Sequence, residues 1–350
     1  MLWIIRYDRG VQLNLPLQVG SQLESYRILR VLAAGGFSFV YLAHDENDAP
    51  VAIKEYLPAT LALRTNGSAQ AHLPEAERGR FNSGMKCFIE EGRSLAHLAH
   101  PNVVRVLNFF RANDTVYLVM RHERGRSLKQ HIVNRKGALP DEVWVRATFA
   151  QLLNGLREVH ANKLLHLDIK PANVFLRNDG SPLLIDFGGA RQTLSAEGVM
   201  LPLTYTPGFA APEQYARTGE LGPWTDIYSV GATVYSCLAS AAPQPAHERL
   251  VKDELLPARR AWADKYSALL LDIVDWCLGP GYGCRGSRLL PVNVNGAPGF
   301  AQYKPDPEGG LAPWSLQVLE IDGDRIAGIT FFLDTERFFP MFGLPAHLSA

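Results

Sequence analysis

Cysteine is scarce in this sequence, and its few thiols form no recognisable metal or redox motif. No two of the four cysteines have the C-x-x-C spacing that is typical of zinc sites and thiol–disulfide catalysts. A chain of 350 residues can bury a core that is large enough to fold without disulfide bonds. We therefore expect buried or free thiols, in a reducing compartment, at Cys87, Cys237, Cys277 and Cys284.

The sequence also lacks net charge and long hydrophobic runs. Lysine and arginine together number 35, and aspartate and glutamate also number 35. Nucleic acids and anionic membranes select basic surfaces, so this balance disfavours both as partners. The best candidate for a membrane span, residues 227–242, is shorter than the ~20 apolar residues that cross a bilayer. Residues 1–6 lack the features of a signal peptide, and we expect a soluble cytoplasmic protein.

What the sequence does have is an ordinary globular composition, with 47% apolar residues and enough length for two domains. Residues 26–64 follow a β-strand pattern, whereas the sequence beyond residue 125 becomes helical. The expected fold class is α+β, with a small β-rich N-lobe, a larger helical C-lobe and a cleft between them. We expect strands at 28–32, 37–43, 51–56, 103–110 and 115–120, and helices at 81–98, 141–161 and 224–239.

The composition changes abruptly after residue 278. A stretch rich in glycine at 279–283 indicates a linker, and Asp322-Gly323 is typical of a hairpin turn between two strands. The rest of this segment is predicted to form alternating strands at 289–294, 314–321 and 325–333.

Two motifs in the strand-rich region suit phosphate binding. Two glycines lie within residues 32–40, and small residues there allow backbone N–H groups to approach phosphate oxygens, although a plain hairpin turn would give the same pattern. Lys54 ends the run Val-Ala-Ile-Lys at 51–54, where a buried charge needs an anionic partner. Glu91 on the following helix is the natural partner, and the alternative is an edge-strand lysine that faces water. Paired in this way, Lys54 would contact the phosphates of a nucleotide.

The decisive pattern is His-Leu-Asp-Ile-Lys-Pro-Ala-Asn at 166–173, followed by Asp-Phe-Gly at 186–188. An apolar strand that ends in Asp186 places a carboxylate where Mg²⁺ can bridge it to phosphate. Asp168 can orient an attacking hydroxyl and accept its proton. Asn173 offers an oxygen ligand to a second Mg²⁺, and Lys170 can balance charge on the transferred group. Each residue alone could be an ordinary loop side chain, but their joint order and spacing favour phosphoryl transfer.

These motifs resemble those of protein kinases, whose set is a Gly-rich loop, V-A-I-K, H-R-D-x-K-x-x-x-N, D-F-G and A-P-E. The resemblance covers about residues 21–278 and includes Ala-Pro-Glu at 211–213. Asp226 matches the aspartate that anchors the catalytic loop of the family. The flanking sequences are similar to bacterial serine/threonine kinases, and Lys170 and Thr206 match the marks of specificity for hydroxyl amino acids.

The resemblance implies a binding site for ATP and Mg²⁺, with Mn²⁺ as an alternative metal. Met120 would be the gatekeeper, and the backbone from Arg121 to Glu123 would be the hinge that binds adenine. The catalytic residues implied are Asp168, Lys170, Asn173, Lys54 and Glu91, and the metal ligands are Asn173 and Asp186. The nucleotide-binding residues implied are Leu32, Ala33, Ala34, Gly35, Gly36, Val40, Ala52, Lys54, Met120, Arg121, Glu123, Phe175 and Asp186.

The sequence departs from the family pattern at three places. Ala33 and Ser38 replace two glycines of the loop, which should make the loop stiffer. Leu167 replaces the arginine that gathers the charge of a phosphorylated activation loop, so control by loop phosphorylation is not expected. Arg285 falls where the family has the partner of the A-P-E glutamate, but the residues that follow do not resemble the final helix.

The C-terminal segment is similar to the accessory, polyketide-cyclase-like domain of some extracytoplasmic-function sigma factors. The similarity lies at 286–298 and 329–337, and it implies only the last strands of a curved antiparallel sheet. A partial sheet leaves an unpaired edge, so we expect this segment to pack against the C-lobe, self-associate or remain poorly ordered.

The predicted organisation is an N-terminal extension at 1–20, a kinase domain at 21–285 and the partial sheet at 286–350, with an N-lobe at about 21–120 and a C-lobe at about 125–285. The predicted function is a protein serine/threonine kinase that transfers the γ-phosphate of Mg-ATP to protein hydroxyls. One alternative is a pseudokinase scaffold that binds partners without catalysis. Another is a kinase fused to a sigma-factor-derived segment that senses a ligand or mediates association.

The leucine at position 167 gives the first testable prediction. Simultaneous replacement of Thr193, Ser195 and Thr204 by alanine should leave most kinase activity, because Leu167 has no charge with which to bind a loop phosphate. The measurement is phosphate transfer to a protein substrate by wild type and by the triple variant. Near-complete loss of transfer in the variant would refute the prediction.

Overall fold

The computed structural model describes residues 14–65, 68–187, 205–215, 221–279, 288–306, 309–322 and 325–349. The chain divides into two compact units, Met1–Leu256 and Pro257–Ala350; the domain limits predicted from sequence stay a prediction. Within the described residues, no helix is long and apolar enough to cross a membrane. Several positions used above lie outside the described residues, namely Gly188, Thr193, Ser195, Thr204, linker residues 280–283, Cys284, Arg285 and Gly323.

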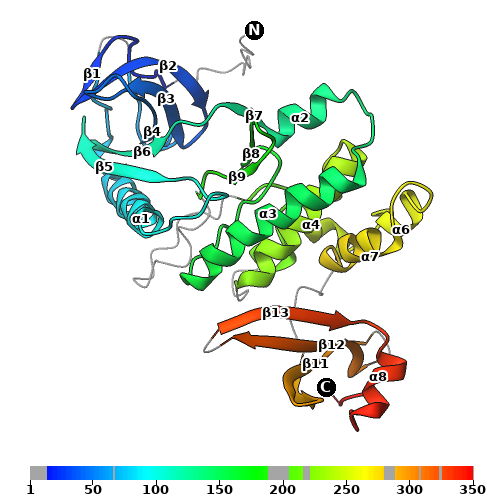
Figure 1. Ribbon diagram of the computed structural model, residues 1–350. Helices are drawn as coiled ribbons and strands as arrows, with labels where there is room; N and C mark the ends of the chain where they lie inside the picture. The colour runs from blue at the N-terminus through cyan, green and yellow to red at the C-terminus, as the bar shows by residue number, and fades with distance from the viewer. Residues whose placement is uncertain are drawn as a thin grey trace. The chain divides into compact units, whose positions relative to one another are not determined.

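The first unit begins with a six-stranded antiparallel sheet in the order β1-β2-β3-β4-β6-β5 (Figure 1). The hairpin between β5 and β6 turns at Asn113 and Asp114, whose positive φ angles of 51° and 60° suit a tight two-residue turn. The strands are β1 (Gln22–Leu23), β2 (Tyr26–Ala34), β3 (Ser38–His44), β4 (Pro50–Tyr56), β5 (Val106–Ala112) and β6 (Thr115–Arg121).

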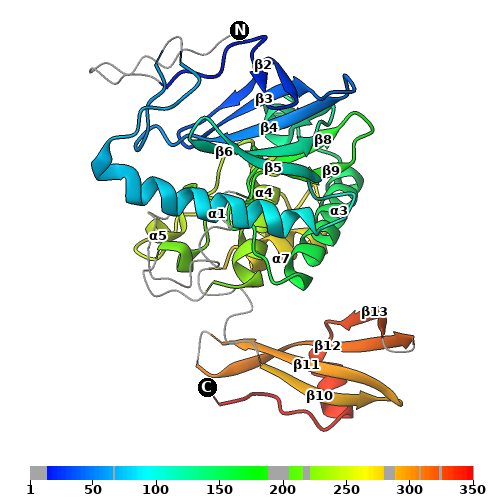
Figure 2. The same cartoon turned by 90° about the vertical axis from the view of Figure 1, so that its left-hand side faces the viewer.

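Helix α1 (Arg78–Ala96) runs along this sheet (Figure 2), after the short 3-10 helix η1 (Glu75–Glu77). Its buried apolar residues Phe81, Phe88 and Leu95 recur every seven positions and so lie on one face. On the same helix, a Cβ atom at Gly84 would collide with the hydroxyl end of the Tyr56 side chain. Glycine at this position therefore lets the helix backbone approach β4.

The rest of the first unit is mainly helical, with a small three-stranded sheet in the order β7-β8-β9. Asp141 begins the long helix α3 by accepting hydrogen bonds from two backbone N–H groups at 2.8 and 3.2 Å. Helix α4 begins with proline and is buried on almost every side. The elements are β7 (Gly125–Ser127), α2 (Leu128–Asn134), α3 (Glu142–Ala161), β8 (Val174–Arg177), β9 (Pro182–Leu184), η3 (Pro212–Tyr215), α4 (Pro223–Ala239) and α5 (Ala246–Arg249).

The predicted α+β class, with a β-rich N-lobe, a helical region and an additional C-terminal sheet, is confirmed. The long elements agree with the sequence pattern to within a few residues, as at 141–161, which forms α3. The segment 103–104 was expected to open a strand but makes only an isolated bridge from Val103 to Leu184, and β5 begins at Val106. The short elements η1, α2, α5, β7 and β8 were not anticipated, because three to seven residues carry too little periodicity to identify them. The apolar strand expected to lead into Asp186 is β9, which ends at Leu184.

A buried charge cluster lies around Glu55 on β4, the residue after Lys54. The Glu55 side chain has no solvent exposure. One carboxylate oxygen accepts hydrogen bonds from Tyr41 at 2.6 Å and from Arg64 Nη1 at 2.9 Å. The other accepts from Tyr117 at 2.6 Å and from Arg64 Nη2. Burial, and then the Glu55 charge, raises the pKa of both phenols above the usual range, so both hydroxyls remain donors.

Arg64 connects this cluster to the chain that precedes the sheet. Its backbone N–H donates to Asn14 Oδ1 at 2.5 Å, and Asn14 Nδ2 donates to the Ala62 carbonyl at 2.9 Å. Leu17 N–H donates to Tyr41 Oη at 3.0 Å. Residues 14–17 and 57–65 are therefore attached to the strands through Glu55.

The second unit holds a four-stranded antiparallel sheet in the order β10-β11-β12-β13. The strands are β10 (Arg288–Val294), β11 (Ala297–Pro305), β12 (Leu311–Asp322) and β13 (Arg325–Phe332), and the helices are α6 (Ala258–Ala261), α7 (Ala268–Cys277) and α8 (Thr335–Met341). The predicted hairpin around residue 322 is present as the pair β12–β13.

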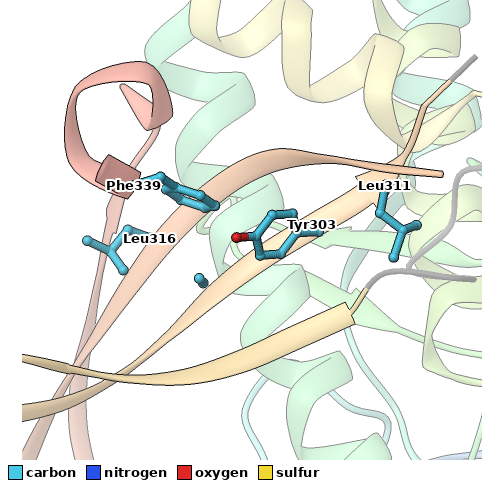
Figure 3. Packing of buried hydrophobic residues seen from close by; sticks show 5 residues of the cluster. Tyr303, Leu311, Leu316 and Phe339 are labelled. Atoms are coloured by element: carbon cyan, nitrogen blue, oxygen red, sulfur yellow. The ribbon is translucent and has the colours of Figure 1, made fainter. Parts of the chain in front are cut away.

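The core of this sheet is made by Tyr303 of β11, Leu316 of β12 and Phe339 of α8, with Ala301 and Leu311 (Figure 3). The rings of Tyr303 and Phe339 meet edge to face, with centroids 5.2 Å apart. Neither β11 nor α8 was predicted from the sequence. Two prolines and a glycine interrupt the alternation of β11, and α8 has only seven residues, one of them proline.

Loss of the Glu55 charge should destabilise the first unit. In Glu55→Gln the Arg64 guanidinium would remain buried without its counter-ion, at a cost of about 3–5 kcal/mol in the free energy of unfolding. Chemical denaturation of the full chain measures this change. The matched control is Glu90→Gln, which breaks the exposed pair with Arg93 and should cost less than about 1 kcal/mol. Equal losses in the two variants would contradict the role given to Glu55.

Candidate active site

The backbone of the loop at 166–168 is hydrogen-bonded to a carboxylate on helix α4. Asp226, which is fully buried, accepts hydrogen bonds from the backbone N–H groups of His166 at 2.9 Å and Leu167 at 2.7 Å. It also lies 2.8 Å from Nε2 of His160 on α3. Leu167 is held with a positive φ of 61°, a conformation that is costly for a residue with a side chain. The bonds to Asp226 therefore fix a loop shape that the chain would not adopt alone.

The Asp168 carboxylate is surrounded by three donors. Its Oδ2 accepts from Lys170 Nζ at 2.7 Å and from Asn173 Nδ2 at 2.9 Å. Its Oδ1 accepts from the Thr206 hydroxyl at 2.9 Å, and that hydroxyl in turn accepts from Lys170 at 2.7 Å. The structure thus brings together the three predicted residues of this motif and adds Thr206 from a distant part of the chain.

Lys54 of β4 joins the N-terminal sheet to the Asp-Phe-Gly region. It is 4% exposed, and its Nζ lies 2.6 Å from Asp186 Oδ1 and 3.9 Å from Glu91 Oε1 on α1. Nζ also lies over the Phe88 ring, 5.4 Å from the centroid. The two carboxylates offset the charge of this buried ammonium, an arrangement that suits a lysine that contacts phosphate.

Asp186 and Asn173 are connected through the backbone. Ile185 N–H donates to the Asn173 carbonyl at 3.0 Å, and Nε2 of His166 lies 3.2 Å from the Ile185 carbonyl. The His166 ring also packs on Phe187, with centroids 4.4 Å apart. Asp186 has a positive φ of 62° and a side chain that is 44% exposed. A carboxylate and an amide are the oxygen donors that Mg²⁺ prefers, so the two residues fit such an ion.

The predicted adenine-side residues lie on one face of the sheet. In the strand register Val40 is opposite Lys54, and Met120 is opposite Ala52. Because alternate residues of a strand share a face, all four side chains lie on the side that carries Lys54. Phe175 comes from β8 of the three-stranded sheet. All except Lys54 are partly exposed, as residues that line an opening would be.

The glycine loop is the turn between β2 and β3. Leu32, Ala33 and Ala34 end β2, and Gly35 N–H donates to the Ser38 carbonyl at 2.9 Å. A Cβ atom at Gly36 would meet nothing within 4 Å. Neither glycine has a positive φ, so backbone conformation does not require glycine here. The absence of side chains leaves the space above the backbone open.

The predicted hinge is partly engaged in internal contacts. Arg121 N–H donates to the Arg105 carbonyl at 2.9 Å. The Glu123 side chain forms an ion pair with Arg177, with Nε 3.0 Å from Oε2. The Arg121 N–H group and the Glu123 side chain are therefore already engaged in contacts within the protein.

Two residues near the loop were missed by the sequence argument. His160 hydrogen-bonds to Asp226. The feature of the sequence that could have identified it is a histidine at the end of the helix that precedes the motif. Gln214 follows Ala-Pro-Glu directly, is 2% exposed and donates from Nε2 to the Leu167 carbonyl at 2.9 Å. Glu213 accepts a hydrogen bond from Thr225 at 2.7 Å, whereas the arginine expected beside it lies outside the described residues.

Comparison with known proteins agrees with this geometry. Residues 26–285 match the family described as protein kinase domain. Mitogen-activated protein kinase kinase kinase ANP1 of Arabidopsis thaliana is 32% identical over 222 residues, which are 63% of this chain and 31% of that protein. CBL-interacting protein kinase 12 of Oryza sativa subsp. japonica is 30% identical over 235 residues, 66% of this chain and 40% of that protein. The chain thus spans about a third of the length of such curated relatives.

Solved structures show the same likeness. The structure titled PpkA-294 apo form has a TM-score of 0.67 and 32% identity, and the match covers 77% of this chain and 96% of that one. The Mycobacterium tuberculosis PknI kinase domain has a TM-score of 0.57 at 23% identity, with 76% of this chain and 92% of that one covered, which shows the fold alone.

Proposed function

The chain belongs to the protein kinase family, and from this premise we propose that it transfers the γ-phosphoryl group of ATP to serine and threonine hydroxyls of protein substrates. Membership of the family alone does not establish activity or an acceptor class, and the proposal assigns both to this chain. A cytoplasmic location stays a prediction.

The observation that supports the proposal best is the set of donors around Asp168. A carboxylate that is surrounded by Lys170, Asn173 and Thr206 is held in one orientation by hydrogen bonds at 2.7–2.9 Å. A fixed carboxylate can orient an acceptor hydroxyl and accept its proton as phosphoryl transfer proceeds. Lys170, at 2.7 Å from Asp168, is close enough to balance the charge of the transferred group.

Nucleotide and metal would bind on the Lys54 side of this set. Lys54, positioned by Glu91, would contact the α- and β-phosphates, while Val40, Ala52, Met120 and Phe175 would enclose the adenine ring. Asn173 and Asp186 would hold Mg²⁺, or Mn²⁺ as an alternative, because both offer oxygen donors. When bound, the metal supplies positive charge that offsets the charge of the phosphates.

The contact of Thr206 with Asp168 and Lys170 favours serine and threonine as acceptors. Its hydroxyl already occupies a position within 2.9 Å of the proposed base, so a short aliphatic hydroxyl fits the same polar surroundings. The protein substrate itself is not encoded in these contacts.

The rival proposal is a pseudokinase scaffold. It is less favoured, because every polar group required for transfer is retained and each has a partner in the described region. Ligand sensing or self-association by the C-terminal sheet, and the similarity of that segment to sigma-factor accessory domains, remain predictions from sequence.

Replacement of Asp168 by asparagine should separate catalysis from binding. Asparagine keeps the size of the side chain but cannot accept a proton, so turnover should fall by about 10²–10⁴-fold while ATP affinity stays nearly unchanged. Transfer of the γ-phosphate to a generic basic protein measures turnover, and calorimetry with Mg-ATP measures affinity.

Two further variants complete this experiment. Asp186→Ala should abolish both transfer and magnesium-dependent ATP binding, and Asp179→Asn, in an exposed turn, is the matched control and should leave both intact. A wild type that binds Mg-ATP without any transfer would favour the pseudokinase, and unchanged turnover in Asp168→Asn would remove Asp168 from the mechanism.

A further inference from the structure

The peptide bond between Leu167 and Asp168 is held at both of its polar atoms. Its carbonyl accepts a hydrogen bond from Gln214 Nε2 at 2.9 Å. Its N–H group, which belongs to Asp168, donates to Nδ1 of His166 at 3.3 Å. Because a peptide unit is planar, these two bonds fix the orientation of the plane from which the Asp168 side chain extends.

Gln214 is itself immobilised at both ends of its amide. Its Oε1 accepts from Ala211 N–H at 2.9 Å, while Nε2 donates to Leu167. The side chain is 2% exposed, so no water competes for these bonds. A buried amide with both ends satisfied is rigid, and it transmits the position of η3 to the loop at 166–168.

The same segment leads back to Thr206. The N–H groups of Phe209 and Ala210 donate to the Thr206 carbonyl at 3.0 and 3.1 Å, and Ala211 holds Gln214. Thr206 donates to Asp168 from one side, and Gln214 fixes the peptide of Asp168 from the other. The segment 206–214 therefore makes two contacts around the proposed base: Thr206 bonds the Asp168 carboxylate, and Gln214 bonds the carbonyl of the preceding residue, Leu167.

We propose that Gln214 is a positioning residue for phosphoryl transfer, which holds the Leu167–Asp168 peptide so that the Asp168 carboxylate meets its donors. This inference rests on the proposed function. It explains how residue 167 can be an apolar leucine, buried to 2% exposure, since the loop is ordered through the carbonyl of this residue and needs no charge on its side chain.

A merely structural role would predict a different result from a positioning role. Loss of a buried hydrogen bond lowers stability wherever it occurs. Loss of orientation at the base lowers kcat and leaves the KM for ATP unchanged, because nucleotide contacts lie on the Lys54 side. The effects on kcat and on KM for ATP, measured separately, therefore distinguish the two roles.

The experiment compares Gln214→Met with Tyr235→Phe in the full chain. Methionine keeps the size of Gln214 but cannot donate to Leu167. The matched control removes a hydroxyl that donates to the Leu256 carbonyl at 3.0 Å. We expect kcat of Gln214→Met to fall roughly 10- to 100-fold with KM for ATP unchanged, whereas the control should keep wild-type kcat.

Gln214→Glu supplies a second variant that retains the acceptor for Ala211. An ionised carboxylate cannot donate to the Leu167 carbonyl, but the protonated acid can. The kcat of this variant relative to wild type should therefore rise as the pH is lowered toward the raised pKa of a buried carboxyl. Gln214→Met cannot be protonated, so its relative kcat should not rise.

The outcomes test the role of Gln214 separately from the proposed kinase activity. Active wild type with unimpaired Gln214→Met would overturn the role of Gln214 alone. Equal losses of kcat in Gln214→Met and Tyr235→Phe would show that the effect is general destabilisation, and would also overturn it. Absence of phosphoryl transfer in the wild type would overturn both the proposed function and the positioning role.

Discussion

The carboxylate of Asp226 accepts two consecutive backbone N–H groups of the loop that carries Asp168, and the geometry of the site depends on these bonds. A charge without solvent contact is unfavourable unless it is fully hydrogen-bonded, and here His160, His166 and Leu167 supply the donors. Charge-assisted bonds of this kind are strong enough to hold Leu167 in a left-handed conformation. With Gln214 on the other side of the same residue, the loop is fixed at both its N–H and its C=O.

Strand β4 serves both the fold and the site because its side chains alternate between faces. Lys54 and Glu55 are consecutive, both are buried, and their charges are opposite. Lys54 lies beside Asp186 and Glu91, whereas Glu55 lies among Tyr41, Tyr117 and Arg64. The alternation of side chains between the two faces separates the charge of Lys54 in the candidate site from the structural charge of Glu55. The strand cannot shift its register by one residue without exchanging these environments.

The sequence predicted the parts of the site that lie in contiguous motifs. Asp168, Lys170 and Asn173 are neighbours in the chain, so their convergence follows from local spacing. Glu55 and Arg64 were not identified, because charged residues near a loop usually face water and only the tertiary fold buries them. Gln214 was missed for a related reason: its partner, the Leu167 carbonyl, is a backbone atom that no side-chain pattern reveals. In the C-terminal sheet, prolines concealed β11, and α8 was too short for its periodicity to be recognised.

The close approach of α1 to β4 at Gly84 determines a spacing that electrostatics alone would not. The ammonium of Lys54 and the carboxylate of Glu91 are 3.9 Å apart, longer than a direct hydrogen bond, so this pair does not draw the helix inward to its limit. The hydroxyl end of the Tyr56 side chain against the bare Cα of Gly84 sets that limit instead. The separation of a charged pair in the site is thus governed by a phenol hydroxyl that meets the helix two turns away, and even one methyl group on Gly84 would widen it.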